Sequence, residues 1–174
     1  MSRINRENEG LLSHAELSTH IKYDPVTGFF YALTNRKSKL KIGQPLGGSL
    51  TTSGYRRICV FQKHYYIHRL VWFYVHKKWP AEYIDHINMD RSDNRLCNLR
   101  EANIFQNRYN ALKRKDNTSG MKGISWNKRS NQWIVQINAN KKKHFLGGFT
   151  DKTKAYEARL KAMQQLHGEF ARIS

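Results

Sequence analysis

The most informative stretch of the chain is Tyr83-Ile-Asp-His-Ile-Asn-Met-Asp-Arg-Ser-Asp-Asn-Arg-Leu-Cys-Asn-Leu-Arg100. Its apolar start predicts a short strand, and Asp85 and His86 follow directly at the end of that strand. Asn98 lies thirteen residues after Asp85, and Asn107 lies nine residues later still, on a helix predicted over residues 101–112. A strand end, a return strand and a helix can bring these four side chains together.

These residue types suit the hydrolysis of a phosphodiester. That reaction needs an activated water molecule and a cation that offsets charge on the phosphorane and on the leaving oxygen. An imidazole is a suitable base near neutral pH, and carboxylate and amide oxygens are hard ligands that suit Mg²⁺ rather than zinc. Spacing alone leaves a second interpretation open, in which His86 is a surface histidine beside a solvated loop rich in asparagine.

Two flanking segments extend the pattern. Ile67-His-Arg-Leu-Val-Trp72 precedes the central stretch, and Gln106-Asn107 follows it. Together the three segments resemble an HNH endonuclease, and they are most similar to the homing type encoded by phages and introns. The resemblance covers about half of the chain. Asn107 stands where many relatives have histidine, which makes this an H-N-N variant, and Met89 stands where relatives often have glycine.

The resemblance implies roles for the four central residues. Asp85 and Asn107 would bind one divalent metal ion, expected to be Mg²⁺, for which Mn²⁺ can substitute. His86 would be the general base, and Asn98 would hold its imidazole in the working orientation. The implied activity is site-specific cleavage of double-stranded DNA, with the metal at the leaving 3′ oxygen and with 5′-phosphate and 3′-hydroxyl products. Nicking and double-strand cleavage both stay open.

The residues before this motif predict a β-rich region. Residues 11–21 have helical spacing, with Ser13 placed to cap them and Glu16 three residues later. Turn residues at 24–28 then lead into an aromatic strand. Residues 37–53 read as a basic loop, residues 55–61 and 65–70 as paired strands, and residues 70–76 as a short helix. His68 and Arg69 allow either a phosphate contact or a packing role.

The residue pattern changes after a charged segment at 113–120, which is predicted to be a linker. Short strands follow at 124–126, 133–137 and 143–146, and a helix that Thr150 or Asp151 can cap carries alanines at helical spacing. Ser119-Gly-Met-Lys-Gly-Ile-Ser-Trp126 and Leu166-His-Gly-Glu-Phe170 belong to a pattern that resembles an apetala-type (AP2-like) DNA-binding domain. Such a domain lays a three-stranded antiparallel sheet in the major groove, with a helix behind it.

Alternation along these strands predicts which side chains face which partner. One set should pack against the helix: Ile124, Trp126, Trp133, Val135, Ile137 and Leu146. The other set should face DNA, with basic residues near the turns: Ser125, Asn127, Lys128, Arg129, Gln136, Asn138, Lys141, Lys143 and Phe145. Arg69 is a further candidate for contact with the DNA backbone. Plant relatives have arginine at several of these sheet positions, so their sequence preference does not transfer.

The expected fold class is therefore α+β in two modules. A nuclease domain spans residues 1–112, with its ββα-metal core at about 82–112, and the AP2-like domain spans residues 121–174. The formal charge of +18 points to a polyanionic partner. No apolar run is long enough to cross a membrane, and Cys59 and Cys97 show no zinc spacing. We expect a monomeric phage enzyme in the host cytoplasm, without a protein partner.

The charge and the C-terminal module would equally suit a DNA-binding regulator that does not cleave, and the charge alone would suit an RNA-binding protein. The set formed by Asp85, His86 and Asn107 distinguishes the enzyme from both alternatives, because binding alone does not need it. The sequence leaves open the target site and the question of whether the enzyme is encoded by an intron or by a free-standing gene.

Overall fold

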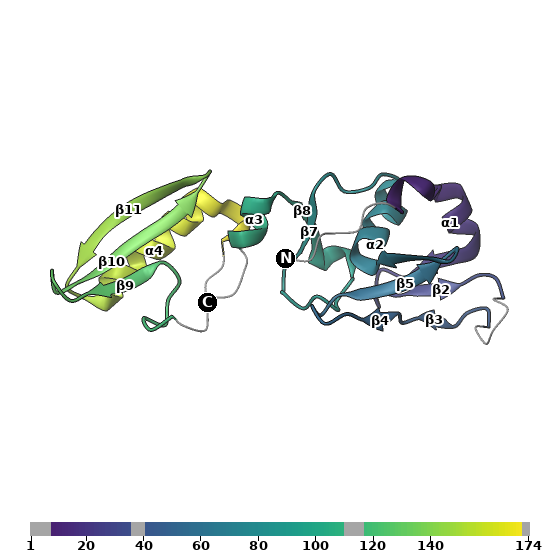
Figure 1. Ribbon diagram of the computed structural model, residues 1–174, viewed down its shortest axis with the longest axis horizontal. Coiled ribbons are helices and arrows are strands. Elements are labelled where there is room, and N and C mark those ends of the chain that lie inside the picture. The colour runs from purple at the N-terminus through teal and green to yellow at the C-terminus, as the bar shows by residue number, and fades with distance from the viewer. Residues whose placement is uncertain (1–7, 36–40, 110–116, 172–174) are drawn as a thin grey trace. The chain divides into compact units, whose positions relative to one another are not determined.

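The computed structural model describes residues 8–35, 41–109 and 117–171, and it divides the chain into two units, Met1–Glu101 and Ala102–Ser174 (Figure 1). Helices and several small sheets are present in the mixed arrangement that the sequence predicts. The predicted linker at 113–120 lies mostly outside the described residues, so the domain boundary proposed there stays a prediction. None of the helices in the described ranges is both long and apolar enough to cross a bilayer.

The first unit opens with a short 3-10 helix, Glu9–Leu11, and α1, His14–His20. The Oγ of Ser13 accepts a hydrogen bond from the backbone N–H of Glu16 at 3.1 Å, which confirms the predicted cap. Strands β1 (Ile21–Tyr23), β2 (Phe30–Ala32) and β3 (Pro45–Leu46) then form an antiparallel sheet. The turn between β1 and β2 is closed by a hydrogen bond of 2.7 Å from the Thr27 hydroxyl to the Asp24 carboxylate.

A second antiparallel sheet contains β4 (Ser49–Leu50), β5 (Arg56–Val60) and β6 (Lys63–Tyr66). Helix α2, Ile67–His76, begins directly after β6. The prediction of a strand over 65–70 is therefore wrong in its second half. Ile67, Leu70 and Val71 are all buried at helical spacing, and this burial decides the structure of the segment. Two short strands, β3 and β4, also occur within the segment predicted to be a loop.

The central stretch forms β7 (Tyr83–His86) and β8 (Leu99–Ala102), which pair in a two-stranded sheet. Turns and a 3-10 helix, Leu96–Asn98, connect them. Helix α3, Ile104–Tyr109, follows, and it starts three residues later than predicted. Asn103 and Gln106 cap it reciprocally, because each side-chain oxygen accepts the backbone N–H of the other at 2.8–2.9 Å.

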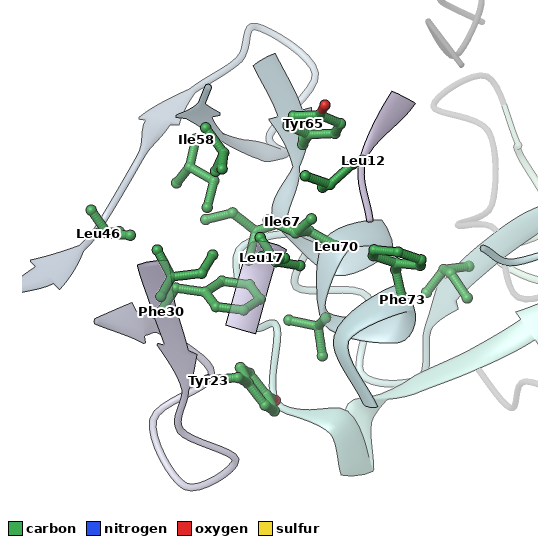
Figure 2. Packing of buried hydrophobic residues seen from close by; sticks show 14 of the residues in the cluster. Leu12, Leu17, Tyr23, Phe30, Leu46, Ile58, Tyr65, Ile67, Leu70 and Phe73 are labelled. Carbon is green, nitrogen blue, oxygen red and sulfur yellow. The ribbon is translucent and has the colours of Figure 1, made fainter. Parts of the chain in front are cut away.

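One apolar core holds the first unit together (Figure 2). Leu17, Phe30, Ile67 and Leu70 are fully buried in it, and they come from α1, β2 and α2. The same cluster reaches Ile84 on β7 and the start of β8. The strands that carry the candidate catalytic residues are thus anchored on the N-terminal region as well as on each other.

The second unit is a three-stranded antiparallel sheet with a helix along one face (Figure 1). The strands are β9 (Ile124–Asn127), β10 (Gln132–Ala139) and β11 (Lys142–Phe149), in the order β11-β10-β9. Helix α4, Lys152–His167, begins at Asp151, whose carboxylate accepts the N–H of Thr153. Strand β9 pairs with residues 132–135 of β10, and within the part of the chain that the structure describes no strand pairs with the second half of β10 on that side.

The predicted faces of this sheet mostly agree with the structure. Val135 and Ile137 are buried beneath α4, whereas Phe145 is 65% exposed on the other face. Trp126 differs from the prediction. It pairs with Trp133 across β9 and β10, but it lies on the edge strand and remains 41% exposed. Its ring therefore contributes less to the core than its place in the alternation suggests.

Candidate active site

Asp85 and His86 lie at the end of β7, and both side chains are buried, with 5% and 4% of their surface exposed. The guanidinium of Arg100 on β8 donates to Oδ2 of Asp85 from Nε at 3.0 Å and from Nη2 at 2.9 Å. The pairing of β7 with β8 thus places a carboxylate, an imidazole and a guanidinium in one small region. A buried carboxylate beside a histidine is an arrangement that occurs at sites of proton transfer.

The imidazole of His86 is oriented by Asn94, a fully buried residue of the loop between β7 and β8. Nε2 of His86 lies 3.5 Å from Oδ1 of Asn94, and Nδ2 of Asn94 donates to the Ser92 carbonyl at 2.9 Å. Burial holds the pKa of His86 below its usual value, although the contact with Asn94 partly opposes this shift. The ring is therefore mainly neutral at pH 7, as a general base requires.

The sequence predicts that Asn98 contacts the imidazole, but its hydrogen bonds in the structure go to the loop. Its Oδ1 accepts the N–H of Asn88 at 2.9 Å, and its Nδ2 donates to the carbonyl of Asp93 at 2.9 Å. It thereby ties together the two ends of the segment that precedes Asn94. Any effect of Asn98 on His86 would pass through this loop, so its predicted role in orienting the imidazole stays a proposal in this indirect form.

The loop also contains a strained residue. Met89 has φ +66°, a backbone conformation that favours glycine. This is the position at which the family resemblance leads us to expect glycine, so the loop retains the turn although the residue has changed. Asp93 stabilises the far side of the loop through an ion pair with Arg95, and hydrogen bonding from Arg95 lowers the pKa of Asp93 to about 2.

A tyrosine from the N-terminal region is hydrogen-bonded to the backbone of the loop between β7 and β8. The hydroxyl of Tyr23 on β1 donates to the Asn94 carbonyl at 3.0 Å and accepts the Leu96 N–H at 2.9 Å. Burial raises the pKa of Tyr23 to about 12, so the hydroxyl stays protonated as a donor. Gly28 lies against the same backbone, because a Cβ there would be 2.7 Å from the Arg95 nitrogen. Sequence reasoning missed Tyr23 and Asn94.

His68 lies at the start of α2 and is buried beside His86. The two ring centroids are 5.2 Å apart, and the ring of Tyr55 lies 4.9 Å from His68. Among the described residues, Nδ1 of His68 has no hydrogen-bond partner. Burial holds the pKa of His68 well below its usual value, so this ring is neutral as well. The structure thus places His68 in the wall of the site.

Arg69 is not a DNA contact, and that prediction is wrong. Its side chain is 1% exposed, and its guanidinium forms a two-armed ion pair with Glu9, in which Nη2 lies 2.8 Å from Oε2. The same guanidinium donates to the Glu82 carbonyl at 2.7 Å and to the Pro80 carbonyl at 3.2 Å. All of these bonds lie inside the first unit, where Arg69 joins α2 to the segment before β7.

Glu9→Gln is therefore expected to lower the free energy of unfolding by about 3 kcal/mol, because it leaves the buried guanidinium without its counter-charge. Urea denaturation followed by circular dichroism measures this loss. Glu16→Gln is the matched control, since Glu16 is exposed on α1, and it should change stability by less than about 0.5 kcal/mol. Equal stability of the two variants would contradict a structural role for the Glu9–Arg69 pair.

Asn107 lies on α3, which belongs to the second unit, whereas Asp85 and His86 belong to the first. The joint metal site of Asp85 and Asn107 therefore stays a prediction. The donor set fits the expected metal chemically, because a carboxylate and an amide oxygen are hard ligands. Among the described residues no cluster of three or more histidine, cysteine, aspartate or glutamate side chains is placed to hold a metal ion.

The nine C-terminal residues predicted to contact DNA are all at the surface of the second unit. Phe145 and Gln136 are cross-strand partners, as are Lys143 and Asn138, so these four share one face of the sheet. The remaining five are exposed on β9 or in the turns: Ser125, Asn127, Lys128, Arg129 and Lys141.

Comparison with known proteins identifies the family of the segment that carries the candidate site. Residues 65–109 match the HNH endonuclease family and include all four central residues, so the chain carries an HNH endonuclease domain. The chain is also 36% identical to Protein 3.8 of Escherichia phage T7 over 91 residues, which are 52% of this chain and 74% of the phage protein. The chain therefore belongs to the same family as this phage protein. No solved structure matches it significantly.

Proposed function

We propose that this protein is a site-specific DNA endonuclease of phage origin that uses one divalent metal ion. The observation that carries the proposal is the buried pair Asp85–His86 at the end of β7, inside the segment that matches the HNH endonuclease family. Binding to DNA does not itself require a neutral, buried imidazole beside a carboxylate, whereas groups of this kind cluster at catalytic sites. The homing type suggested by the resemblance is part of this proposal.

In the proposed reaction, His86 accepts a proton from a water molecule as the water oxygen attacks phosphorus. The bond from phosphorus to the 3′ oxygen breaks, and the released 3′ oxygen takes up a proton from a solvent water molecule, which leaves a 5′-phosphate and a 3′-hydroxyl. Asn94 orients the imidazole from its buried position, and burial keeps the base neutral before the reaction. Asp85 and Asn107 would hold the metal ion, expected to be Mg²⁺, which supplies charge stabilisation when bound. Arg100 neutralises the Asp85 carboxylate.

The direct test is incubation of the full chain with supercoiled phage or host DNA in the presence of Mg²⁺, Mn²⁺ or EDTA. We expect nicked or linear DNA with either metal and intact DNA with EDTA. Resealing of the nicks by DNA ligase would identify the 5′-phosphate and 3′-hydroxyl ends. DNA that is bound but not cut under every condition would favour the alternative of a DNA-binding regulator.

The C-terminal unit is proposed to bind duplex DNA through the face that carries Gln136, Asn138, Lys143 and Phe145. The double variant Lys141→Ala/Lys143→Ala should weaken binding to all sequences alike. It should also make the plot of log affinity against log salt shallower by about 0.9 for each phosphate that the variant no longer neutralises. Fluorescence anisotropy at several salt concentrations measures both effects, and Lys154→Ala on the exposed start of α4 is the control.

Gln136→Ala or Asn138→Ala should behave differently, because amide side chains can read adenine edges. Each should change the preference at particular base pairs with little change in the salt dependence. Selection from a random DNA library would reveal this shift. A lysine double variant that binds DNA like the wild type would argue against this face as the DNA-binding surface.

A further inference from the structure

A pocket of about 450 Å³ lies within the second unit, beside the half of β10 that β9 leaves uncovered. Its walls come from α3, from residues 122–123, from β10 and the start of β11, and from α4. Six of its lining residues are cations: Arg108, Lys122, Lys141, Lys142, Lys143 and Arg159. No carboxylate occurs among the described residues that line it. The pocket is thus strongly positive.

Contacts between its walls hold the pocket in shape. Tyr109 on α3 stacks on His167 of α4, with ring centroids 3.8 Å apart and planes 6° from parallel. The Tyr109 hydroxyl accepts the N–H of Asn140 at 3.0 Å. Nζ of Lys122 donates to the carbonyls of Arg108 and Tyr109 at 2.9 and 3.3 Å. The chain therefore builds a defined cavity here rather than a loose gap.

Arg159 is the unusual member of the lining. It is 5% exposed, and its Nε donates to the Lys122 carbonyl at 3.1 Å. Its Nη1 is buried, and among the described residues this atom has no hydrogen-bond partner. No ion pair to Arg159 occurs in the described ranges, in contrast to Arg69, which pairs with Glu9. A buried guanidinium without a counter-charge is costly and calls for an anion.

We infer that this pocket receives a phosphate group of the nucleic-acid backbone, with Arg159 as its main anchor. A planar guanidinium matches phosphate oxygens well. The pocket is also continuous with the proposed DNA-binding face, because Gln136, Asn138 and Lys143 belong to both. A backbone phosphate of the same DNA can therefore reach it. The inference rests on the proposed DNA binding of the second unit.

The test compares two variants of the full chain that each remove one charge from α4. Arg159→Met acts in the pocket, whereas Lys161→Met acts on the exposed side of the helix. Arg159→Met should weaken duplex binding about 10-fold or more, because a charge-assisted hydrogen bond disappears, and Lys161→Met should weaken it about 2-fold or less. Without DNA, the melting temperature of Arg159→Met should equal or exceed that of the wild type, since the unpaired buried charge is gone.

A second experiment works with the wild-type chain and so does not depend on the folding of a variant. Duplexes that carry one neutral methylphosphonate linkage are scanned along the binding site. One position should weaken wild-type binding about 10-fold, and the same position should have no further effect on Arg159→Met. If Arg159→Met does not fold, Lys142→Met, on the exposed rim of the pocket, replaces it in this comparison with a smaller loss.

Several outcomes would overturn the inference. In the first, Arg159→Met binds DNA as tightly as Lys161→Met does but has a lower melting temperature than the wild type. Arg159 would then have a structural role only. A second such outcome combines two results: inorganic phosphate raises the melting temperature of the wild type more than chloride at equal ionic strength, and the methylphosphonate scan finds no sensitive position. The pocket would then be a site for free anions. Failure of the wild type to bind DNA at all would refute the proposed function and this inference together, whereas the first two outcomes leave DNA cleavage untouched.

Discussion

His86→Ala is expected to lower the rate of DNA cleavage by about 10²–10⁴-fold, because that is the usual contribution of a general base. DNA affinity should change little, since His86 is buried and the proposed DNA-binding face lies on the second unit. Single-turnover cleavage of a supercoiled substrate with saturating enzyme measures the rate, and gel shift in EDTA measures the affinity.

His64→Ala is the matched control for this experiment. His64 is an exposed histidine on β6, and its removal should leave the cleavage rate within about 2-fold of the wild type. Free imidazole should restore part of the activity to His86→Gly, which provides a cavity of the right shape. Cleavage by His86→Ala at the wild-type rate would show that another group removes the proton, and His68, with its ring 5.2 Å away, would be the first candidate.

Asp85→Ala and Asn107→Ala should each reduce metal-dependent cleavage by about 10³-fold, because charge stabilisation by a bound metal is worth several kcal/mol. Each substitution removes an oxygen ligand from a site with few protein ligands. Asp85→Ala also leaves Arg100 without the carboxylate that it contacts, so circular dichroism must show that the variant is folded. Cleavage is measured over a range of Mg²⁺ concentrations.

Asp90→Ala is the control for the acidic ligand, since Asp90 is an exposed aspartate of the same loop. A higher Mg²⁺ concentration should restore part of the cleavage rate of Asn107→Ala, because this variant loses only a neutral ligand. The same increase should restore less of the rate of Asp85→Ala. If the wild type still cleaves DNA in EDTA, the proposal of a metal-dependent HNH reaction is wrong. Full activity of Asn107→Ala would remove only Asn107 from the site.

Local rules predicted much of the fold. Ser13 and Asp151 cap the helices that their positions indicate, because an N-cap depends on residues a few positions away. The three C-terminal strands and the final helix likewise follow from local alternation and spacing. The boundary at Ile67 was missed because an apolar run of this length fits a strand or a helix equally well. Its burial under the N-terminal region decides the matter, and that contact is not local.

The same distinction applies to the candidate site. Asp85 and His86 were found because their neighbours in sequence form a motif. Asn94 was missed because it is one polar residue among many in the loop, and only its burial beside His86 distinguishes it. Arg69 was misjudged because its partner, Glu9, lies sixty residues away in sequence. Nothing in the local sequence of an arginine shows whether its charge is already paired inside the protein.

The support that Tyr23 gives to the Asn94–Leu96 backbone has an evolutionary consequence. The segment that matches the nuclease family begins at residue 65, yet Tyr23 and the core residues Leu17 and Phe30 come from well before it. A gene exchange that moved only the matching segment would separate the catalytic loop from the residues on which it rests. Selection should therefore favour crossovers that keep the N-terminal region, the matching segment and Asn107 on α3 together as one block.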